Sequence, residues 1–291
     1  MKIAIIGYYS DDMGENSTNC FSVLSMYLSR SLRKMGHIVY PYHILKGGVN
    51  TDQKVDIVIT ILFANDASNI QQWKTKLGAK KIVSFLEIPT PDVDYAFMFN
   101  KTNYDTYHLN SKTVTLLKFP WLGFNITNKE PKSIFLDHCW PDWLNNTTGQ
   151  NIDRSKEISL WLFDSGFKVY KHTRFPEDYS MLKDEEIAIP IKPYEEYLKT
   201  IQPIDTYIIT HSESFAYGII DFISTGSKIL IHENCSIQQT IRDIFNVKSF
   251  KTKKELMNLL ENNSYIKPDI SNFYTYDQIA TIMVKYFNSW I

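Results

Sequence analysis

The sequence DTYIITHSESFAYGIIDFISTGSKILIH, from Asp205 to His232, holds an apolar strand, a helix and a second apolar strand in succession. The pattern predicts a strand over Asp205–Thr210, a helix over about Phe215–Thr225 that ends at Gly226, and a strand over Lys228–His232. Such a βαβ unit is typical of a parallel α/β sheet. The fold class expected from this stretch is therefore α/β.

The turn between the first strand and the helix is where this unit would bind a ligand. In open parallel sheets, ligands lie beyond the carboxyl ends of the strands, where free helix N–H groups receive an anion. Gly218 has no Cβ and would let a bulky anion approach the first helical turn. Glu213 and Asp221 are eight residues apart, so a helix would separate them by about 12 Å along its axis and about 80° around it. One carboxylate could accept hydrogen bonds from a sugar and the other from a ribose, with a diphosphate between them. A nucleotide sugar is therefore the leading ligand class.

A set of residues in this stretch resembles the E-x7-E segment of retaining glycosyltransferases of the GT-B fold: Ser212, Glu213, Gly218, Asp221 and Gly226. The resemblance implies that Glu213 contacts the donor sugar and that Asp221 contacts the ribose. Ser212 and Gly218, as members of the same motif, join the expected substrate-binding residues. The chain departs from the family pattern in two places. Its second acid is Asp instead of Glu, and the proline that usually follows the helix is replaced, with Ser227 in that region.

A simpler interpretation of the two acids is also open. Glu213 would then be an acid in the first turn, favoured by the helix dipole, and Asp221 would be a solvated residue on the outer face of the helix. We favour the binding interpretation because the strand, the turn, the helix, the glycine and the second strand occur together.

Composition describes a globular chain long enough for two domains. Its 291 residues are 44% hydrophobic, and 31 Lys and Arg stand against 32 Asp and Glu. This balance gives no argument for a polyanionic partner, so DNA as a partner has no support from charge. The three cysteines match no disulfide framework, no signal sequence opens the chain, and no apolar run approaches the roughly 18 residues of a membrane span. We therefore expect a cytoplasmic protein without a transmembrane segment.

An N-terminal Rossmann-like acceptor domain is expected over residues 1–125. The run LSRSLRKMGHIV, from Leu28 to Val39, resembles the first helix and second strand of GT-B glycosyltransferases, with Gly36 as the helix stop. The loop after the first strand lacks the G-x-G-x-x-G fingerprint, which disfavours a dinucleotide-dependent oxidoreductase. Glu87 ends a predicted strand, where it would face an interdomain cleft and position the acceptor or act as a base. A surface acid or a helix cap is the simpler alternative for Glu87.

A second Rossmann-like domain, for the nucleotide sugar, is expected over residues 131–275, after a linker at Pro120–Lys132. Thr252 and Glu255 predict a capping box at the start of a helix in this domain. The amphipathic helix over 276–291 would cross back to the first domain, as the GT-B resemblance implies. The two Rossmann-like domains would face a central cleft.

The diphosphate also needs a cationic partner. The Arg and Lys that GT-B relatives carry after the first strand of the second domain are missing here. The nearest replacements are Arg154, Lys156, Lys171 and Arg174. A solvated surface charge is the simpler interpretation of each. His138 and His211 end predicted strands beside the expected site and are candidates for phosphate or sugar contacts. No residues have metal-site spacing, and neither a metal nor a cofactor is expected.

Together with these observations, the GT-B resemblance implies a metal-independent hexosyltransferase, for which we expect Glu213 and Glu87 as the catalytic residues. It would move a sugar from a UDP- or GDP-sugar to a hydroxyl of a glycan, a lipid-linked sugar or a modified nucleobase. Retention of configuration is implied by the E-x7-E resemblance alone. Two alternatives are open: a nucleotide-sugar epimerase of the same fold, and a non-catalytic GT-B-like protein, which the missing Arg and Lys would suit.

Overall fold

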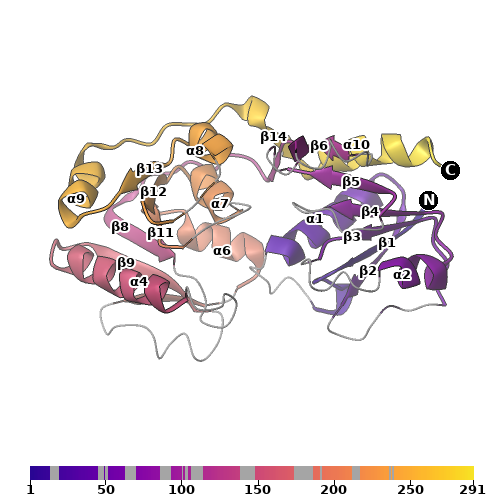
Figure 1. Cartoon of the computed structure of the whole chain (residues 1–291), viewed down its shortest axis with the longest axis horizontal. Helices are drawn as coiled ribbons and strands as arrows, with labels where there is room; N and C mark the ends of the chain where they lie inside the picture. Colours follow the sequence, from indigo (N-terminus) through magenta and orange to yellow (C-terminus); the bar gives the residue numbers. More distant parts are fainter. Residues whose placement is uncertain are drawn as a thin grey trace. The chain divides into compact units, whose positions relative to one another are not determined.

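The chain divides into two units, shown in the cartoon of Figure 1. Unit 1 comprises Met1–Leu122 together with Ser271–Ile291, and unit 2 comprises Gly123–Ile270. The computed structural model describes residues 1–13, 20–44, 49, 52–62, 70–85, 93–99, 101, 104–105, 114–137, 148–173, 186–190, 192–211, 217–235, 237 and 239–291.

Unit 1 is built on a six-stranded parallel sheet with the order β2-β1-β3-β4-β5-β6. Its strands are β1 (Lys2–Gly7), β2 (Ile38–His43), β3 (Ile57–Thr60), β4 (Lys81–Phe85), β5 (Tyr95–Met98) and β6 (Val114–Leu116). The helical elements are η1 (Asp11–Met13), α1 (Cys20–Lys34) and α2 (Ile70–Leu77). The strands β3, β5 and most of β1 and β4 are buried, as expected for parallel strands that are covered on both faces.

The end of the chain completes unit 1. Strand β14 (Phe273–Thr275) pairs in parallel with β7 (Phe119–Trp121), and helix α10 (Tyr276–Asn288) follows at once. A capping box between Thr275 and Gln278 starts α10. Tyr276 stacks on Tyr27 of α1 with ring centroids 5.1 Å apart, and Asp277 accepts a hydrogen bond of 2.7 Å from Ser31. The last helix therefore belongs to the same unit as the first.

Unit 2 has a second six-stranded parallel sheet, with the order β10-β9-β8-β11-β12-β13. Its strands are β8 (Glu130–Asp137), β9 (Lys168–Thr173), β10 (Ile187–Pro190), β11 (Ile204–Ile209), β12 (Lys228–His232) and β13 (Lys248–Phe250). Its helical elements are α4 (Thr148–Phe163), α6 (Tyr194–Ile201), α7 (Tyr217–Thr225), α8 (Gln239–Phe245), α9 (Lys253–Asn262) and, across the boundary with unit 1, η3 (Ile270–Asn272). This is the strand order of a Rossmann sheet.

Two apolar layers cover the sheet of unit 2. On one face α4 and α9 pack on the strands through Ile158, Leu162, Leu256 and Leu260. On the other face Phe222 of α7 stacks on Tyr207 of β11, with centroids 4.4 Å apart, and Tyr197 of α6 stacks on His172 of β9. Figure 1 shows α6 and α7 close together on this second face. Helices on both faces explain why β11 and β12 are almost wholly buried.

The structure confirms the strand–helix–strand unit predicted from Asp205 to His232. It appears as β11, α7 and β12, with the helix ended by Gly226 at a φ of +91°. The predicted linker Pro120–Lys132 is only partly correct, because Pro120 lies in β7 and β8 already begins at Glu130. The units divide at Leu122 and Ile270, a few residues from the expected limits of 125, 131 and 275. The sequence did not reveal β7 because its partner, β14, lies about 150 residues later.

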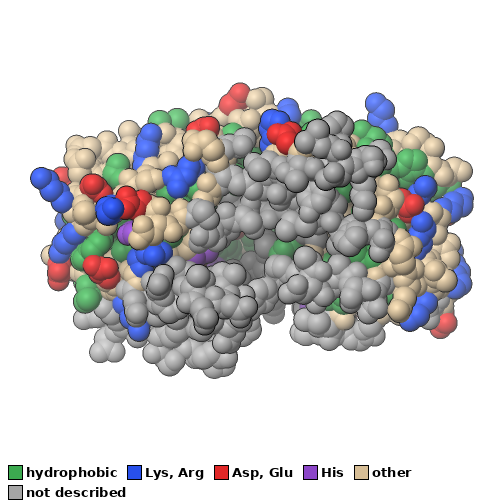
Figure 2. All heavy atoms as spheres, in the orientation of Figure 1, with side chains coloured by type: hydrophobic (Ala, Val, Ile, Leu, Met, Phe, Trp, Pro, Cys, Tyr) green, Lys and Arg blue, Asp and Glu red, His purple; other side chains and the backbone are tan. Residues whose placement is uncertain are grey.

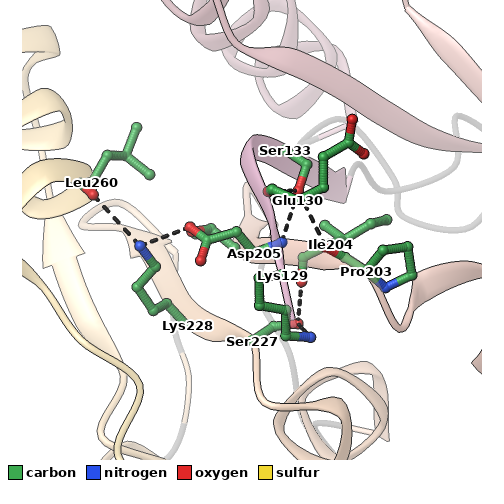
Figure 3. Close-up of polar contacts among 10 residues, drawn as sticks. Lys129, Glu130, Ser133, Pro203, Ile204, Asp205, Ser227, Lys228 and Leu260 are labelled. Atoms are coloured by element: carbon green, nitrogen blue, oxygen red, sulfur yellow. Dashed lines mark hydrogen bonds and ion pairs between the residues drawn. The ribbon is translucent and has the colours of Figure 1, made fainter. Parts of the chain in front are cut away.

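A polar network lies where the strands of unit 2 begin, shown in Figure 3. Strand β8 is irregular here, since Glu130 pairs with Ile204 but Ile134 pairs with Thr206, and Lys132 has a φ of 58°. The hydroxyl of Ser133 bridges the irregularity by donating to the carbonyl of Glu130 (2.6 Å) and accepting from the amide of Asp205 (2.9 Å). A buried serine thus supplies the hydrogen bonds that the bulge removes from the ladder.

Lys129 lies at the same end of unit 2 and is surrounded by oxygen atoms. Its Nζ donates to the carbonyl of Gln202 (2.7 Å), to Thr225 Oγ1 (3.3 Å) and to Ser227 Oγ (3.1 Å). Burial lowers the pKa of Lys129 to about 8, with a partial opposing effect from Asp205. These acceptors lie at the C-terminal ends of α6 and α7, where a cation is favourable.

The lowered pKa of Lys129 predicts a pH-dependent stability. Between pH 8 and the ordinary lysine pKa of 10.5, the unfolded chain binds more protons than the folded chain, so the free energy of unfolding rises with pH in that window. Wild type should therefore gain stability relative to Lys129→Met as pH increases from 8 to 10.5, in thermal melts recorded side by side. Lys199→Met, at an exposed position on α6, is the control and should show no such trend. A difference between wild type and Lys129→Met that stays constant with pH would contradict this prediction.

Candidate functional site

The order of the strands points to a candidate ligand site in unit 2. The chain moves outward from β8 to β9 and β10, then returns to β11 beside β8 and continues outward on the other side through β12 and β13. The helices that follow β8 and β11, α4 and α7, consequently lie on opposite faces of the sheet. In open α/β sheets, ligands bind at the carboxyl ends of the strands where the direction reverses in this way. The candidate site is therefore the end of β8 and β11.

Asp137, the last residue of β8, is held by two residues of β11 and its turn. Tyr207 Oη donates a hydrogen bond to the Asp137 carboxylate, and Thr210 Oγ1 donates to the Asp137 carbonyl at 2.6 Å. The start of α7 lies above this pair, since a Cβ on Gly218 would be only 2.6 Å from Tyr207 Oη. Close packing against Tyr207 is therefore one reason for a glycine at position 218, and the sequence did not reveal it. The approach of an anion, expected from the sequence, would be a second reason.

Asp221 lies one turn further along α7 and is buried, with 7% of its surface exposed. Tyr194 of α6 donates a hydrogen bond from its hydroxyl to the Asp221 carboxylate. The alternative that Asp221 is a solvated residue on an outer face is wrong, because α7 is buried on nearly every side between α6 and the sheet. A buried carboxylate with a fixed donor has a defined orientation.

Arg154 links three elements at this edge. It extends from α4 and donates from Nη1 to the carbonyl of Thr210 (3.2 Å), after β11, and to Cys235 Sγ (3.3 Å), after β12. Burial and the charge of Arg154 both lower the pKa of His232, at the end of β12. Burial raises the pKa of the Cys235 thiol, and Arg154 opposes that rise. Arg154 is thus a half-buried cation at the carboxyl edge, and the alternative of a solvated surface charge does not describe it.

Two other predicted residues are buried in unit 2. Lys171 of β9 forms an ion pair of 2.8 Å with Glu186, which accepts a 2.6 Å hydrogen bond from Ser159 of α4. This group lies inside the unit, so Lys171 is not a solvated charge either. His211, two residues after the end of β11, is also buried. The structure therefore brings Arg154, His211, Gly218 and Asp221 to the end of β11 and the first turns of α7.

Lys156 is exposed on α4. The other predicted residues lie outside the part of the chain that the structure describes. They are Glu87, His138, Arg174, Ser212 and Glu213. Three residues of the site were not predicted: Asp137, Tyr194 and Tyr207. Asp137 could have been found as the last residue of the apolar run SIFLD, whereas nothing local marks either tyrosine.

The surface charges in view and the possible metal ligands among the described residues do not mark a further site. On the face in view in Figure 2, basic and acidic side chains are intermingled over the described residues of unit 2. Within the described ranges, no three His, Cys, Asp or Glu side chains come together in a way that could hold a metal ion. No helix among the described residues is both long enough and apolar enough to cross a bilayer.

Comparison with known proteins identifies the fold. No protein-family model matches the chain, and no curated protein matches it in sequence. The UDP-GlcNAc 2-epimerase of Methanocaldococcus jannaschii, solved with UDP-GlcNAc and UDP, has a TM-score of 0.60 at 10% identity, over 98% of this chain and 100% of that one. The chain has the GT-B fold.

Other GT-B structures are similar over the same length. A glycosyltransferase from Rickettsia africae has a TM-score of 0.60 at 10% identity, over 99% of this chain and 98% of that one. The DNA-modifying enzyme β-glucosyltransferase has a TM-score of 0.50 at 14% identity, over 100% of this chain and 97% of that one. The expected pair of Rossmann-like domains is therefore confirmed as the fold class.

The contact between Gly218 and Tyr207 predicts a measurable coupling. Gly218→Ala should destabilise the fold by about 1–3 kcal/mol through overpacking, although Ala favours a helix over Gly by about 1 kcal/mol. Tyr207→Phe removes the clashing oxygen, so the double variant should be more stable than the two single effects predict, by about 1 kcal/mol or more. Denaturant unfolding of the four proteins measures this, and strictly additive effects would show that the contact does not exist.

Proposed function

We propose that this chain is an enzyme acting on a nucleoside diphosphate sugar, which unit 2 binds at the carboxyl ends of β8 and β11. The observation that carries the proposal is the reversal of strand order at β8 and β11, where Asp137, Arg154 and the start of α7 come together. The UDP complex of the epimerase with the same fold supports this ligand class.

The diphosphate would lie at the start of α7. Free N–H groups of the first helical turn and the helix dipole favour an anion there. Arg154 would supply the positive charge, and its guanidinium is already oriented by the Thr210 carbonyl, so little side-chain freedom is lost on binding. Lys171 and Arg174 are further candidates, although Lys171 already neutralises Glu186.

The acids would bind the two sugars of the ligand. Asp221, oriented by Tyr194, would accept hydrogen bonds from the ribose hydroxyls, and Glu213 would accept them from the donor sugar. Ser212, His138 and His211 would contribute further hydrogen bonds. In unit 1, Glu87 would position the acceptor or take its proton.

The reaction we favour is transfer of a hexosyl group to a hydroxyl acceptor. The bond between the anomeric carbon and the diphosphate breaks, a bond to the acceptor oxygen forms, and the acceptor proton leaves to a base. Arg154 and the α7 dipole would stabilise the charge that develops on the departing diphosphate, while the sugar gains oxocarbenium character. Retention of configuration rests on the E-x7-E resemblance.

A nucleotide-sugar epimerase is the second candidate. The comparisons support it as well as a transferase, because a UDP-GlcNAc 2-epimerase and a glycosyltransferase have the same TM-score of 0.60 to this chain. Both would use the donor site of unit 2. They differ in that an epimerase needs no acceptor.

Donor binding should depend on the residues assigned to the site. A thermal-shift panel should contain UDP, UDP-sugars and GDP-sugars. A ligand that binds, present at about 100 times its own Kd, should stabilise the wild type by about 2.7 kcal/mol. Arg154→Met should weaken binding about 10- to 100-fold, the effect of losing one charged hydrogen bond of about 1.5–3 kcal/mol. Asp221→Asn and Glu213→Gln, which preserve side-chain shape, should weaken it as well.

The controls are Lys199→Met, exposed on α6, and Asp243→Asn, exposed on α8. Both should bind donors like the wild type. If no nucleotide or nucleotide sugar stabilises the wild type, the proposal is wrong; if all the site variants bind as tightly as the controls, the site is misplaced.

Product analysis separates the two reactions. With UDP-GlcNAc or UDP-glucose and no acceptor, a transferase should leave the sugar ring unchanged and release UDP only slowly. An epimerase should produce a new set of ring-proton signals in the NMR spectrum while the UDP-sugar total stays constant. Formation of the epimer without an acceptor would show that the chain is an epimerase and would contradict the transferase.

A further inference from the structure

Cys235 follows β12 and is not among the residues assigned to bind the donor. Only 3% of its surface is exposed, and its sulfur accepts a hydrogen bond of 3.3 Å from Arg154 Nη1. The backbone of Cys235 is held as well, since its N–H donates to the His232 carbonyl (2.9 Å) and its carbonyl accepts from Arg242 Nη2 (3.5 Å). A buried side chain on a backbone held in this way has few alternative positions. The sulfur is therefore a fixed acceptor at the carboxyl edge of the sheet.

Arg154 is held by one acceptor from each of two neighbouring strands. Thr210 follows β11 and Cys235 follows β12, and these two strands pair in parallel. Nη1 makes both hydrogen bonds, at 3.2 Å to the Thr210 carbonyl and 3.3 Å to Cys235 Sγ. The N–H groups of a guanidinium lie in one plane. One acceptor would let that plane turn about the hydrogen bond, whereas two acceptors fix it.

Neither of these two acceptors carries a charge at neutral pH. Burial raises the pKa of the Cys235 thiol above its ordinary value of 9.0, although the charges of Arg154 and Arg242 oppose the rise. The thiol consequently remains protonated at neutral pH, and the Thr210 carbonyl has no charge at any pH. A carboxylate in either place would form an ion pair with Arg154 and compete with a bound phosphate. The two contacts orient the guanidinium and do not cancel its charge.

We propose that Cys235 is a positioning residue of the donor site, whose sulfur fixes the plane of the Arg154 guanidinium for a bidentate contact with the diphosphate. This inference rests on the proposed function, because it takes the ligand of Arg154 to be a nucleoside diphosphate. Bidentate binding of phosphate by arginine depends on the direction of the planar fork as well as on its charge. A sulfur that fixes the plane and leaves the charge in place meets both requirements.

His232 reports the position of Arg154 when no ligand is present. It is the last residue of β12, and 6% of its surface is exposed. Burial lowers the pKa of His232, and the charge of Arg154 lowers it further, while the acids Glu233 and Glu157 act in the opposite direction. If Arg154 turns away once the sulfur is removed, the pKa of His232 should rise toward its ordinary value of 6.5.

Three substitutions of Cys235 test the role on the full chain. Cys235→Ala removes the acceptor and should weaken the binding of UDP about three- to tenfold, the effect of losing one hydrogen bond of ordinary strength. Cys235→Val should act in the same way, because it fills the space of the thiol without an acceptor, and it serves if the alanine variant does not fold. Cys235→Ser supplies a neutral hydroxyl acceptor and should bind UDP within about twofold of the wild type. Thermal melts without ligand show which variants are folded.

Two measurements separate positioning from a general loss of packing. Uridine has the base and the ribose of UDP but no diphosphate, so its Kd, measured by NMR titration, should be the same in the wild type and in all three variants. The pKa of His232, assigned in NMR spectra with His232→Gln, should be higher in Cys235→Ala and Cys235→Val than in the wild type and Cys235→Ser. A purely structural thiol would weaken uridine as much as UDP and would leave this pKa unchanged.

Ile237→Val is the matched control. Ile237 is buried in the same connection between β12 and α8 and has no polar side-chain atom to offer Arg154. Shortening it disturbs the packing of this connection and leaves the acceptor in place. The Kd of UDP, the Kd of uridine and the pKa of His232 should all remain those of the wild type.

The outcomes distinguish this inference from the proposed function. If UDP binds the wild type and binds Cys235→Ala and Cys235→Val equally well, or if these variants lose uridine as strongly as UDP, the positioning role is overturned while the proposed function stands. If calorimetry detects no binding of UDP or of a UDP-sugar to the wild type, the proposed function fails and the role in binding a diphosphate fails with it. The pKa of His232 then still shows whether the sulfur fixes Arg154.

Discussion

The pairing of β8 with β11 is the constraint on which the rest of unit 2 depends. These are the first and fourth strands of the unit, yet they are neighbours at the centre of its sheet. Right-handed crossovers then send the chain away from β8 over one face and away from β11 over the other. The helices α4 and α7 diverge from one edge, and the residues that end the two strands lie at the base of the candidate site. Asp137 and Thr210, 73 residues apart in sequence, are hydrogen-bonded there.

Polar groups inside unit 2 are placed to hold this arrangement. At the carboxyl edge, tyrosine hydroxyls of β11 and α6 bind Asp137 and Asp221. At the opposite edge, Ser133 bridges the bulge of β8, and Ser227 Oγ donates to the carbonyl of Ile204 at 2.7 Å. A buried polar group without a partner costs about 1–3 kcal/mol, so each pair resists any shift in the register of the strands it joins. The same helix, α7, has its first turns at one edge and its last residues at the other.

Much of the local structure could be predicted from the sequence. The βαβ unit, the helix stop at Gly226 and the capping box of Thr252 with Glu255 are all present. Each depends on residues within a few positions of one another, where spacing and backbone preference are sufficient. The motif also directed attention to Asp221 and Gly218, which do lie at the carboxyl edge. The sequence did not predict their neighbours, because nothing local indicates that Tyr194 binds Asp221 or that Tyr207 packs against Gly218.

The sequence by itself determined the alternation of strands and helices, the ends of several helices and the α/β class, because these follow from interactions between near neighbours in the chain. Only the tertiary structure decided that β8 lies beside β11, that Arg154 reaches Thr210 and Cys235, and that Lys129 and Tyr265 both bind the end of α7. These contacts join residues tens of positions apart. Their partners are selected by how the helices pack on the sheet, and no local pattern of residue types encodes that choice.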